Sequence, residues 1–205
     1  PGLRELVRGW EWECLTEQGR FMIKRYLSML LLGIVTFSHG SLAHAGAIDE
    51  AVRRGVLKVG TNPAYVPFEM TDKKGRIVGF EIDLLREMSK ALGVKLELVS
   101  VPYTDLIPGL LASRFDLIGS GMTVTQERNL TLNFSDSFII VGQTVLLHPR
   151  LAEQVHSIED LNEAGYRIAA AEGTTGEAAA KRFLGAARLH SFPTPEEGVR
   201  QVVEG

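Results

Sequence analysis

Apolar positions in the middle of the chain switch repeatedly between the spacing of strands and the spacing of helices. Apolar or alternating runs at 56–60, 94–101 and 115–119 predict three strands. Apolar residues at helical spacing predict a helix over 81–92 and a second one over 104–113. Strands that alternate with helices are typical of a parallel sheet with crossover connections, so this part of the chain is predicted to be an α/β lobe.

Local signals mark the ends and connections of these elements. Asp83 and Thr104 are the residues expected to cap the two helices. Residues 61–68 contain two prolines and predict a loop without regular structure. The charged, glycine-containing turn at 72–76 lies between two short apolar stretches and predicts a hairpin.

A second α/β pattern follows a long β-prone run at 139–147, which is long enough to leave one lobe and enter another. The elements predicted after it are a helix start at 157–160, a strand at 166–171, a turn at 173–176, a helix at 176–184, a strand at 188–192 and a capped helix from Thr194. The sequence therefore predicts a first α/β lobe at 46–141 and a second, incomplete α/β lobe at 142–205, with a cleft between them.

The beginning of the chain has the layout of a secretory signal peptide at residues 22–45. Two basic residues, 24–25, precede an apolar stretch at 27–37, and 43–45 form a small-x-small cleavage site before Gly46. The apolar stretch has 11 residues, fewer than the roughly 18 needed to span a bilayer, so export is favoured over a membrane anchor. Residues 1–21 fit no targeting pattern and remain unexplained.

Composition restricts the class of protein further. The 205 residues are 45% hydrophobic and carry a formal net charge of -3 without a basic cluster, which fits a globular protein and argues against a nucleic-acid partner. The only cysteine, Cys14, lies upstream of the predicted cleavage site, so the mature part has no disulfide and no cysteine for lipid attachment. A soluble periplasmic or secreted protein is predicted, and not a lipoprotein.

The clearest binding chemistry lies in residues 120–128. This stretch follows the predicted strand at 115–119, and the carboxyl ends of strands are where parallel sheets bind ligands. Thr125 can cap a short helix, and the glycine and hydroxyl residues before it leave N–H groups free to face an anion. Arg128 supplies a planar fork suited to a carboxylate. A surface arginine in an ordinary ion pair is the alternative interpretation.

No catalytic signature is present. The chain lacks HExxH, GxSxG, GxGxxG and P-loop motifs, and the histidines after the signal region, His148, His156 and His190, stand alone in or beside predicted loops. Ser120 has no evident base to activate it. The sequence predicts no enzyme, no cofactor and no metal site.

Four motifs resemble, in the same order, the bacterial extracellular solute-binding proteins of family 3, which deliver polar amino acids to ABC importers. The motifs are residues 60–69, 79–85, 120–128 and 172–176, and the resemblance runs from about Ile48 to the end of the chain. It implies a two-lobed, type II periplasmic-binding-protein fold, a polar amino acid as ligand and an ABC permease of the inner membrane as partner. It also implies a periplasmic monomer.

The resemblance implies roles for individual residues. Arg128 would bind the α-carboxylate of the ligand, assisted by Thr123 and by backbone groups of Gly121 and Thr175, and Tyr65 would cover the ligand side chain. The ligand-binding residues implied in this way are Asn62, Tyr65, Phe68, Ser120, Gly121, Thr123, Arg128, Thr174 and Thr175. Core packing is the alternative for the two rings, and it is the favoured interpretation for Phe68.

The choice of ligand and the completeness of the pocket stay open at this point. Asn62 occupies a place where family members that take basic amino acids often carry an acid, which favours a neutral ligand such as glutamine, whereas Glu172 leaves a cationic one open. The family's aspartate for the ligand ammonium has no counterpart before Gly205, so residues 46–205 alone are expected to bind more weakly than a longer chain.

Two other functions are compatible with the same resemblance. A cyclohexadienyl dehydratase-like enzyme, acting on arogenate or prephenate, would require a proton-transferring acid in the cleft. A sensor module of a larger signalling protein would require a transmembrane helix and an effector domain beyond Gly205.

Overall fold

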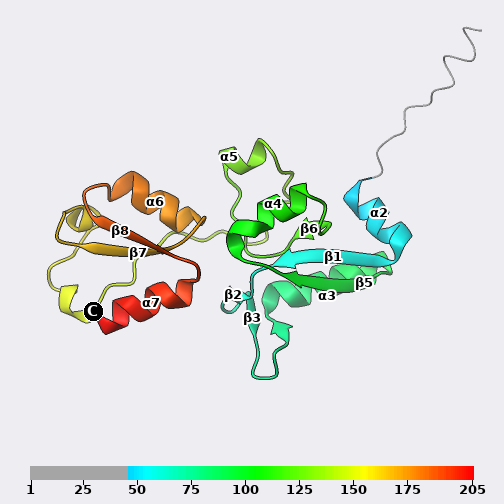
Figure 1. The fold of residues 1–205 in the computed structure, drawn as a ribbon, viewed down its shortest axis with the longest axis horizontal. Coiled ribbons are helices and arrows are strands. Elements are labelled where there is room, and N and C mark those ends of the chain that lie inside the picture. Colours follow the sequence, from blue (N-terminus) through cyan, green and yellow to red (C-terminus); the bar gives the residue numbers. More distant parts are fainter. Residues whose placement is uncertain (1–45) are drawn as a thin grey trace, which may run out of the picture. The chain divides into compact units, whose positions relative to one another are not determined.

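The computed structural model describes residues 46–205, so the segment 1–21 and the predicted signal peptide at 22–45 lie outside the described residues. The first lobe is built on a three-stranded sheet of β1 (Val56–Thr61), β5 (Lys95–Ser100) and β6 (Leu117–Ile118) in the order β5-β1-β6 (Figure 1). Both pairs are parallel, with Val56 opposite Lys95 and Val59 opposite Leu117. The predicted parallel sheet is confirmed.

The helices of this lobe connect the strands as predicted, but their starts differ. α3 (Phe80–Leu92) ends at Gly93, whose φ of 69° is the left-handed conformation that suits glycine. Its N-cap is Gly79, and Asp83 pairs with Arg86 instead, so the predicted cap was wrong. Thr104 likewise lies inside the 3-10 turn η1 (Tyr103–Asp105), which precedes α4 (Leu106–Leu111). A further helix, α2 (Ala47–Arg54), was not predicted.

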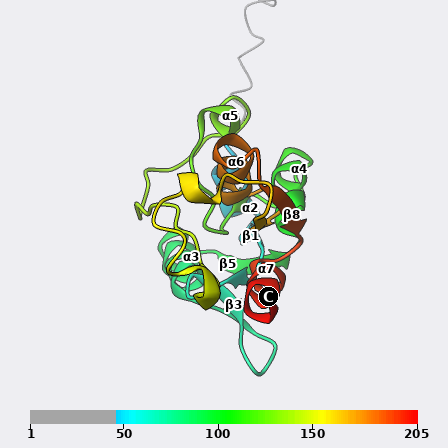
Figure 2. The same cartoon turned by 90° about the vertical axis from the view of Figure 1, so that its left-hand side faces the viewer.

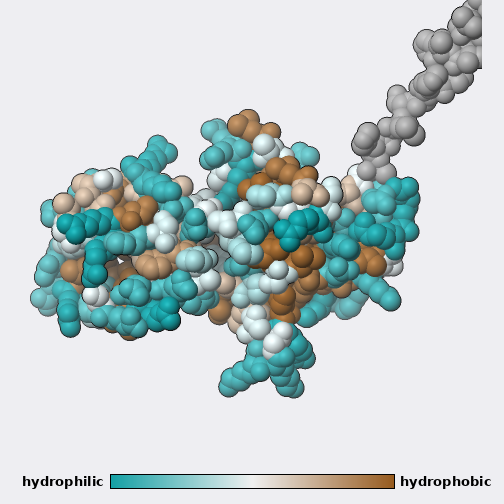
Figure 3. Space-filling view, in the orientation of Figure 1, coloured by the Kyte–Doolittle hydropathy of each residue, from teal (hydrophilic) through white to brown (hydrophobic). Residues whose placement is uncertain are grey.

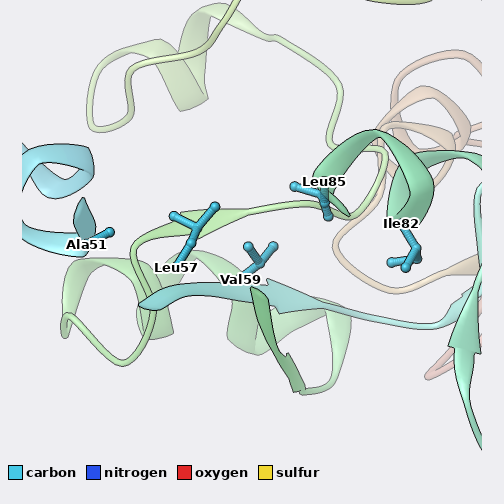
Figure 4. Close-up of a cluster of buried hydrophobic side chains, with 5 residues drawn as sticks. All are labelled: Ala51, Leu57, Val59, Ile82 and Leu85. Carbon is cyan, nitrogen blue, oxygen red and sulfur yellow. The ribbon is translucent and has the colours of Figure 1, made fainter. Parts of the chain in front are cut away.

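The sheet is packed on both faces. Leu57 and Val59 of β1 point to one face and pack with Ile82 and Leu85 of α3, as Figure 4 shows. On the other face, the ring of Phe115 packs with Leu106 of α4. These two apolar clusters hold the carboxyl ends of β1 and β6 in fixed positions.

A small antiparallel sheet carries the predicted hairpin. β2 (Ala64–Tyr65), β3 (Glu69–Thr71) and β4 (Ile77–Val78) lie in the order β2-β3-β4, with Met70 opposite Val78. Figure 3 shows the charged turn at 72–76, between β3 and β4, as a hydrophilic projection. The loop predicted at 61–68 is therefore irregular except for Thr61, the last residue of β1, and the two residues of β2, which pair with β3.

The run at 139–147 does not form the predicted strand. None of the backbone groups of 133–147 bonds to another backbone group within the described residues. Ile140 is 93% exposed, and neighbouring apolar side chains are also exposed. A strand needs a partner to satisfy its N–H and C=O groups, and β propensity alone does not supply one.

The second lobe contains two parallel strands, β7 (Arg167–Ala171) and β8 (Arg188–Phe192). Both α6 (Thr175–Phe183) and α7 (Pro195–Glu204) contact this pair, one on each side of it in Figure 1, and Figure 2 shows the lobe from its end. Thr174 and Thr194 cap these helices by accepting the N–H groups of Glu177 and Glu197, and the cap at Thr194 had been predicted.

Short 3-10 turns replace the helix predicted from Ser157. η2 (Pro149–Leu151) and η3 (Glu159–Leu161) are each a single turn. The Asp160 carboxylate accepts the N–H groups of His156 and Ser157, each at 2.8 Å. Ser157 therefore does not act as the predicted cap, because the aspartate three residues later already holds this turn.

Candidate functional site

A cavity of about 540 Å³ lies at the carboxyl ends of β1 and β6 and includes residues of the second lobe. Eight of the nine residues predicted to bind a ligand line it: Asn62, Tyr65, Phe68, Ser120, Gly121, Thr123, Thr174 and Thr175. Its remaining wall is mainly the irregular segment 134–144. The structure thus brings together residues that are more than 100 positions apart in the sequence.

The turn at 120–121 forms the wall of this cavity beside β6. The Ser120 hydroxyl is 3% exposed; it donates to Glu69 Oε1 at 3.1 Å and accepts the Asn62 N–H at 2.9 Å. Gly121 has a φ of 53°, and a Cβ at this position would lie 2.8 Å from the Tyr65 ring. Only glycine combines this backbone conformation with such a close approach.

Arg128 lies on α5 (Gln126–Asn129), whose start is capped by Thr125 as predicted. Its Nη1 donates to the Thr123 carbonyl at 2.8 Å and its Nη2 to the Gly173 carbonyl at 3.0 Å. Arg128 is not among the residues that line the cavity, and it forms no ion pair with any residue of 46–205. The guanidinium fork is thus bonded to one carbonyl from each lobe, and its predicted role toward a carboxylate remains a prediction.

Aromatic rings form a continuous row beside the cavity. Tyr65 stacks on Phe68 with a centroid distance of 5.1 Å, and Phe68 meets Phe80 edge to face at 6.1 Å. Phe80 is in turn 6.1 Å from Phe138. Phe68 lines the cavity and belongs to neither apolar cluster of the first lobe, so the favoured interpretation of Phe68 as a core residue does not match its position.

Several polar groups that face the cavity already have partners. Asn62 Nδ2 donates to the Val101 carbonyl at 3.0 Å, and Thr175 Oγ1 accepts from Gln143 Nε2 at 2.9 Å. The Thr174 hydroxyl donates to the Ala171 carbonyl at 2.7 Å. These bonds fix the side chains that border the cavity. Glu172 is exposed and does not line the cavity.

Two buried acids below the 120–121 turn were not identified as site residues. Glu69 of β3 is fully buried and lines the cavity, and Glu81 of α3 is 6% exposed. Burial, together with the charge of Glu81, raises the pKa of Glu69 to about 8. Burial also raises the pKa of Glu81, although the Gly121 N–H, which donates to Glu81 Oε2 at 2.7 Å, opposes this shift.

Tyr103 of η1 completes the surroundings of Arg128. The guanidinium carbon lies 6.0 Å from the centre of its ring. Burial raises the pKa of the Tyr103 hydroxyl, and the positive charge of Arg128 acts in the opposite direction. Tyr103 also lines the cavity, which gives the site an aromatic residue that sequence reasoning had missed.

Other chemistry is not apparent among residues 46–205. No group of three or more His, Cys, Asp and Glu side chains in this range could hold a metal ion. No helix in the same range is long and apolar enough to cross a membrane. Ser120 does have a carboxyl group in reach, but Glu69 holds a proton at neutral pH and the hydroxyl is buried, so this pair does not make an activated nucleophile.

Comparison with known proteins identifies relatives of this chain. The family model of the bacterial extracellular solute-binding proteins, family 3, matches residues 57–182. The histidine-binding periplasmic protein of Escherichia coli (strain K12) is 33% identical over 156 residues, 76% of this chain and 56% of that protein. The cyclohexadienyl dehydratase of Pseudomonas aeruginosa is 27% identical over 182 residues, 88% of this chain and 68% of that protein.

Solved structures have the same fold. An ancestral amino acid-binding protein, described as a precursor of cyclohexadienyl dehydratase, is 42% identical with a TM-score of 0.76, over 78% of this chain and 70% of that one. A protein of Wolinella succinogenes complexed with lysine is 47% identical with a TM-score of 0.71, over 74% and 65%. The predicted type II, two-lobed α/β fold is confirmed.

The match is extensive for this chain and partial for its relatives. The chain spans about half the length of the histidine-binding relatives it matches, 47% of one and 56% of another. The family model nevertheless covers most of the residues that the structure describes, including both β1 and the 120–128 motif. The chain belongs to the bacterial extracellular solute-binding proteins, family 3.

Proposed function

We propose that this protein binds a polar amino acid in the cavity and delivers it to an ABC importer. The observation that carries the proposal is the assembly of eight predicted ligand residues, drawn from three separate sequence motifs, around one cavity. That cavity combines an aromatic surface, Tyr65 and Phe68, with polar groups of Ser120, Thr123 and Thr174. An amino acid, which has an apolar stem and charged ends, matches such a mixture.

Arg128 is the group that recognises the ligand carboxylate in this proposal. Its two donors are bonded to neutral backbone carbonyls at Thr123 and Gly173. A carboxylate is a stronger acceptor than a carbonyl, and it can take both arms of the guanidinium fork at once. The ligand carboxylate would therefore compete well for the Nη groups. Its binding would replace the hydrogen bond from Arg128 Nη2 to the Gly173 carbonyl, which links the two lobes.

Lobe closure follows from ligand contacts on both lobes. Tyr65 and Ser120 contact the ligand from the first lobe, and Thr174 and Thr175 from the second. A ligand that touches both lobes favours the closed arrangement by its differential affinity, which is the energetic basis of hinge closure. The closed form is then the form that an importer in the inner membrane recognises.

The relatives favour a cationic amino acid over a neutral one. One relative, from Escherichia coli, is named for lysine, arginine and ornithine, and one solved structure of this fold holds lysine. In this chain the Asn62 amide donates to the Val101 carbonyl. The neutral amide is therefore weaker support for a neutral ligand than the sequence had indicated. Glu69, which lines the cavity, and Glu81, which accepts the Gly121 N–H, are acidic residues that would suit a cationic ligand.

The proposal includes a location and a state of assembly. A protein that passes amino acids to an inner-membrane importer works in the periplasm, as the name of the Escherichia coli relative states for that protein. The predicted signal peptide at 22–45 would provide the export, and the absence of cysteine after residue 45 argues against a lipid anchor. We propose a soluble monomer.

Binding by Arg128 can be tested directly by titration calorimetry with histidine, lysine, arginine and glutamine. Arg128→Met should weaken binding of the preferred amino acid by at least about 30-fold, because a charged partner of the carboxylate is lost. The matched control is Arg86→Met, which removes an exposed arginine paired with Asp83 on α3 and should leave affinity unchanged. Undiminished binding by the Arg128 variant would refute the proposal.

A dehydratase is the second candidate, because the Pseudomonas aeruginosa enzyme aligns with 88% of this chain. Such an enzyme needs an acid in the cavity, and Glu69 is an acid there that carries a proton at neutral pH. Its full burial and its neighbour Glu81 leave that proton poorly placed for a substrate. Release of phenylpyruvate or phenylalanine from prephenate or arogenate would establish the enzyme, and its absence alongside amino-acid binding would support the binding protein.

A further inference from the structure

Two carboxyl groups from different elements meet beneath the turn at 120–121. Glu69 belongs to β3 and Glu81 to the first turn of α3, and both are buried, at 0% and 6% exposure. Glu69 Oε1 accepts the Ser120 hydroxyl at 3.1 Å, and Glu81 Oε2 accepts the Gly121 N–H at 2.7 Å. Each acid therefore holds one residue of the same turn.

The second oxygen of Glu69, Oε2, is buried and has no hydrogen-bond donor among the described residues. An unpaired anionic oxygen in this position would be costly, and two adjacent buried carboxylates would also repel each other. A single proton held between the two carboxyl groups, which are side-chain hydrogen-bond partners, removes both problems. The pair then holds one proton and one negative charge.

No cation among the described residues balances the pair. Neither acid takes part in an ion pair within 46–205. The other titratable groups nearby are Tyr65, whose ring borders Gly121, and Tyr103, on whose hydroxyl Glu69 acts. Arg128 directs both of its arms at backbone carbonyls. The charge state of the pair is therefore set by burial and by the two acids themselves.

We propose that Glu69 and Glu81 are positioning residues that share a single proton and thereby fix the 120–121 turn for ligand binding. The proposal rests on the function proposed above, since the turn borders the same cavity. The effect extends to Asn62, because the Ser120 hydroxyl that donates to Glu69 also accepts the Asn62 N–H. Both edges of the cavity at the ends of β1 and β6 depend on this network.

The shared proton makes ligand binding depend on pH in a defined direction. The pKa of about 8 at Glu69 places the loss of the shared proton above neutral pH. Once the proton is lost, two buried carboxylates repel each other and the groups that hold Ser120 and Gly121 separate. Affinity for the amino acid should therefore fall as the pH rises from 7 to 9.5.

Glutamine at position 69 provides a test that keeps the geometry. Its amide can donate to Glu81 and accept from Ser120, as the protonated acid does, but it cannot ionise. Glu69→Gln should bind the amino acid within about threefold of the wild type at pH 7, and should lack the further fall that we expect in the wild type, about tenfold or more by pH 9.5. Glu87→Gln, on the exposed side of α3, is the matched control and should follow the wild type.

Comparison among variants is necessary because the ammonium group of a free amino acid also titrates in this range. That contribution is common to the three proteins, so the difference between Glu69→Gln and Glu87→Gln measures the pair alone. A Glu69→Gln protein that folds but loses binding at pH 7, or that keeps the full alkaline fall, overturns the proposal.

A measurement without ligand separates this proposal from the proposed function. In the wild-type full chain labelled with carbon-13 at glutamate carboxyl groups, one carboxyl signal should titrate near pH 8, and the Gly121 amide proton should shift over the same range. Titration of both acids at their ordinary values near pH 4.5 overturns the shared proton. Titration near pH 8 in a protein that binds no amino acid would support the shared proton and would contradict only the proposed amino-acid binding.

Discussion

Glu177 is a buried carboxylate with three donors at the start of α6. It accepts from Lys181 Nζ at 2.9 Å, from the Ser191 hydroxyl at 2.5 Å and from the Gly173 N–H at 3.0 Å. These bonds lower the pKa of Glu177 to about 2, and the bond from Lys181 has the largest effect. The carboxylate thus ties the turn at 173–174, which also holds Arg128 through the Gly173 carbonyl, to β8.

The stability of the protein should therefore fall in acid. The pKa of Glu177 is lower in the folded state than in the unfolded one, so its contribution is complete above about pH 4.5 and is lost as the pH falls toward 2. Glu177→Gln should lower the free energy of unfolding at pH 7 by about 1 to 3 kcal/mol, since Lys181 is exposed and partly screened, and should flatten the acid slope. Urea unfolding between pH 2.5 and 7 measures both, and an unchanged slope would contradict the assignment. The exposed Glu172→Gln variant is the control.

Single residues differ in how far the sequence reveals them. Arg128 and Tyr65 stand out because their side chains suit a ligand and their motifs resemble a family. Glu69 and Glu81 do not, because their roles arise from contacts with Ser120 and Gly121 that span 51 and 40 positions. A buried acid is recognised only when the elements that cover it are known. The position of Glu69 and Glu81 beside apolar residues was only a weak indication that they are buried.

Among the elements, β1 and α4 approach each other through one aromatic ring. A Cβ at Gly60 of β1 would lie 2.5 Å from the Phe115 ring, and one at Gly109 of α4 would lie 2.6 Å from it. The absence of side chains at these two glycines therefore sets the distance between strand and helix. This packing supports the end of β1, from which Asn62 reaches the cavity.

Gly60→Ala should accordingly destabilise the first lobe by overpacking, by about 1 to 3 kcal/mol. The double variant Gly60→Ala with Phe115→Leu should lose less stability than the sum of the losses of the two single variants. The smaller leucine side chain leaves room for the alanine methyl group. Thermal unfolding measures both, with Gly142→Ala, where a Cβ meets nothing within 4 Å, as the control. Additive losses in the double variant would show that the ring is not the obstacle.

Local signals and distant pairing were each predicted in part. The parallel pairing of β1 with β5 and β6 is confirmed, whereas the caps expected at Asp83 and Thr104 do not form. The caps at Thr125 and Thr194 depend on a few neighbouring residues, and they are confirmed. The run at 139–147 has the composition of a strand but lacks a partner within the described residues, so its local preference has no effect. Composition identifies what a segment can form, and pairing decides what it does form.

At the scale of the whole molecule, the segment 133–147 differs from the two lobes that it connects. Its backbone forms no hydrogen bond with the backbone of any described residue, whereas β1 pairs along its full length with β5. Residues 134–144 of this segment also line the cavity. The same stretch is therefore a wall of the proposed ligand site whose backbone does not pair with any described strand.

Hydrogen exchange can test whether residues 134–144 contact the bound amino acid. In residues 46–205 without ligand, amides of 133–147 should exchange faster than those of β1 and β5, because none of them bonds to a described backbone carbonyl, whereas the two strands are paired. A saturating amino acid should slow exchange in 134–144 and leave β1 and β5 unchanged. The Arg128→Met variant, whose affinity should be at least about 30-fold lower, serves as the control at an amino-acid concentration that saturates the wild type but not the variant. If calorimetry detects binding while exchange in 134–144 stays unchanged, the amino acid occupies a different site and this wall does not close on it.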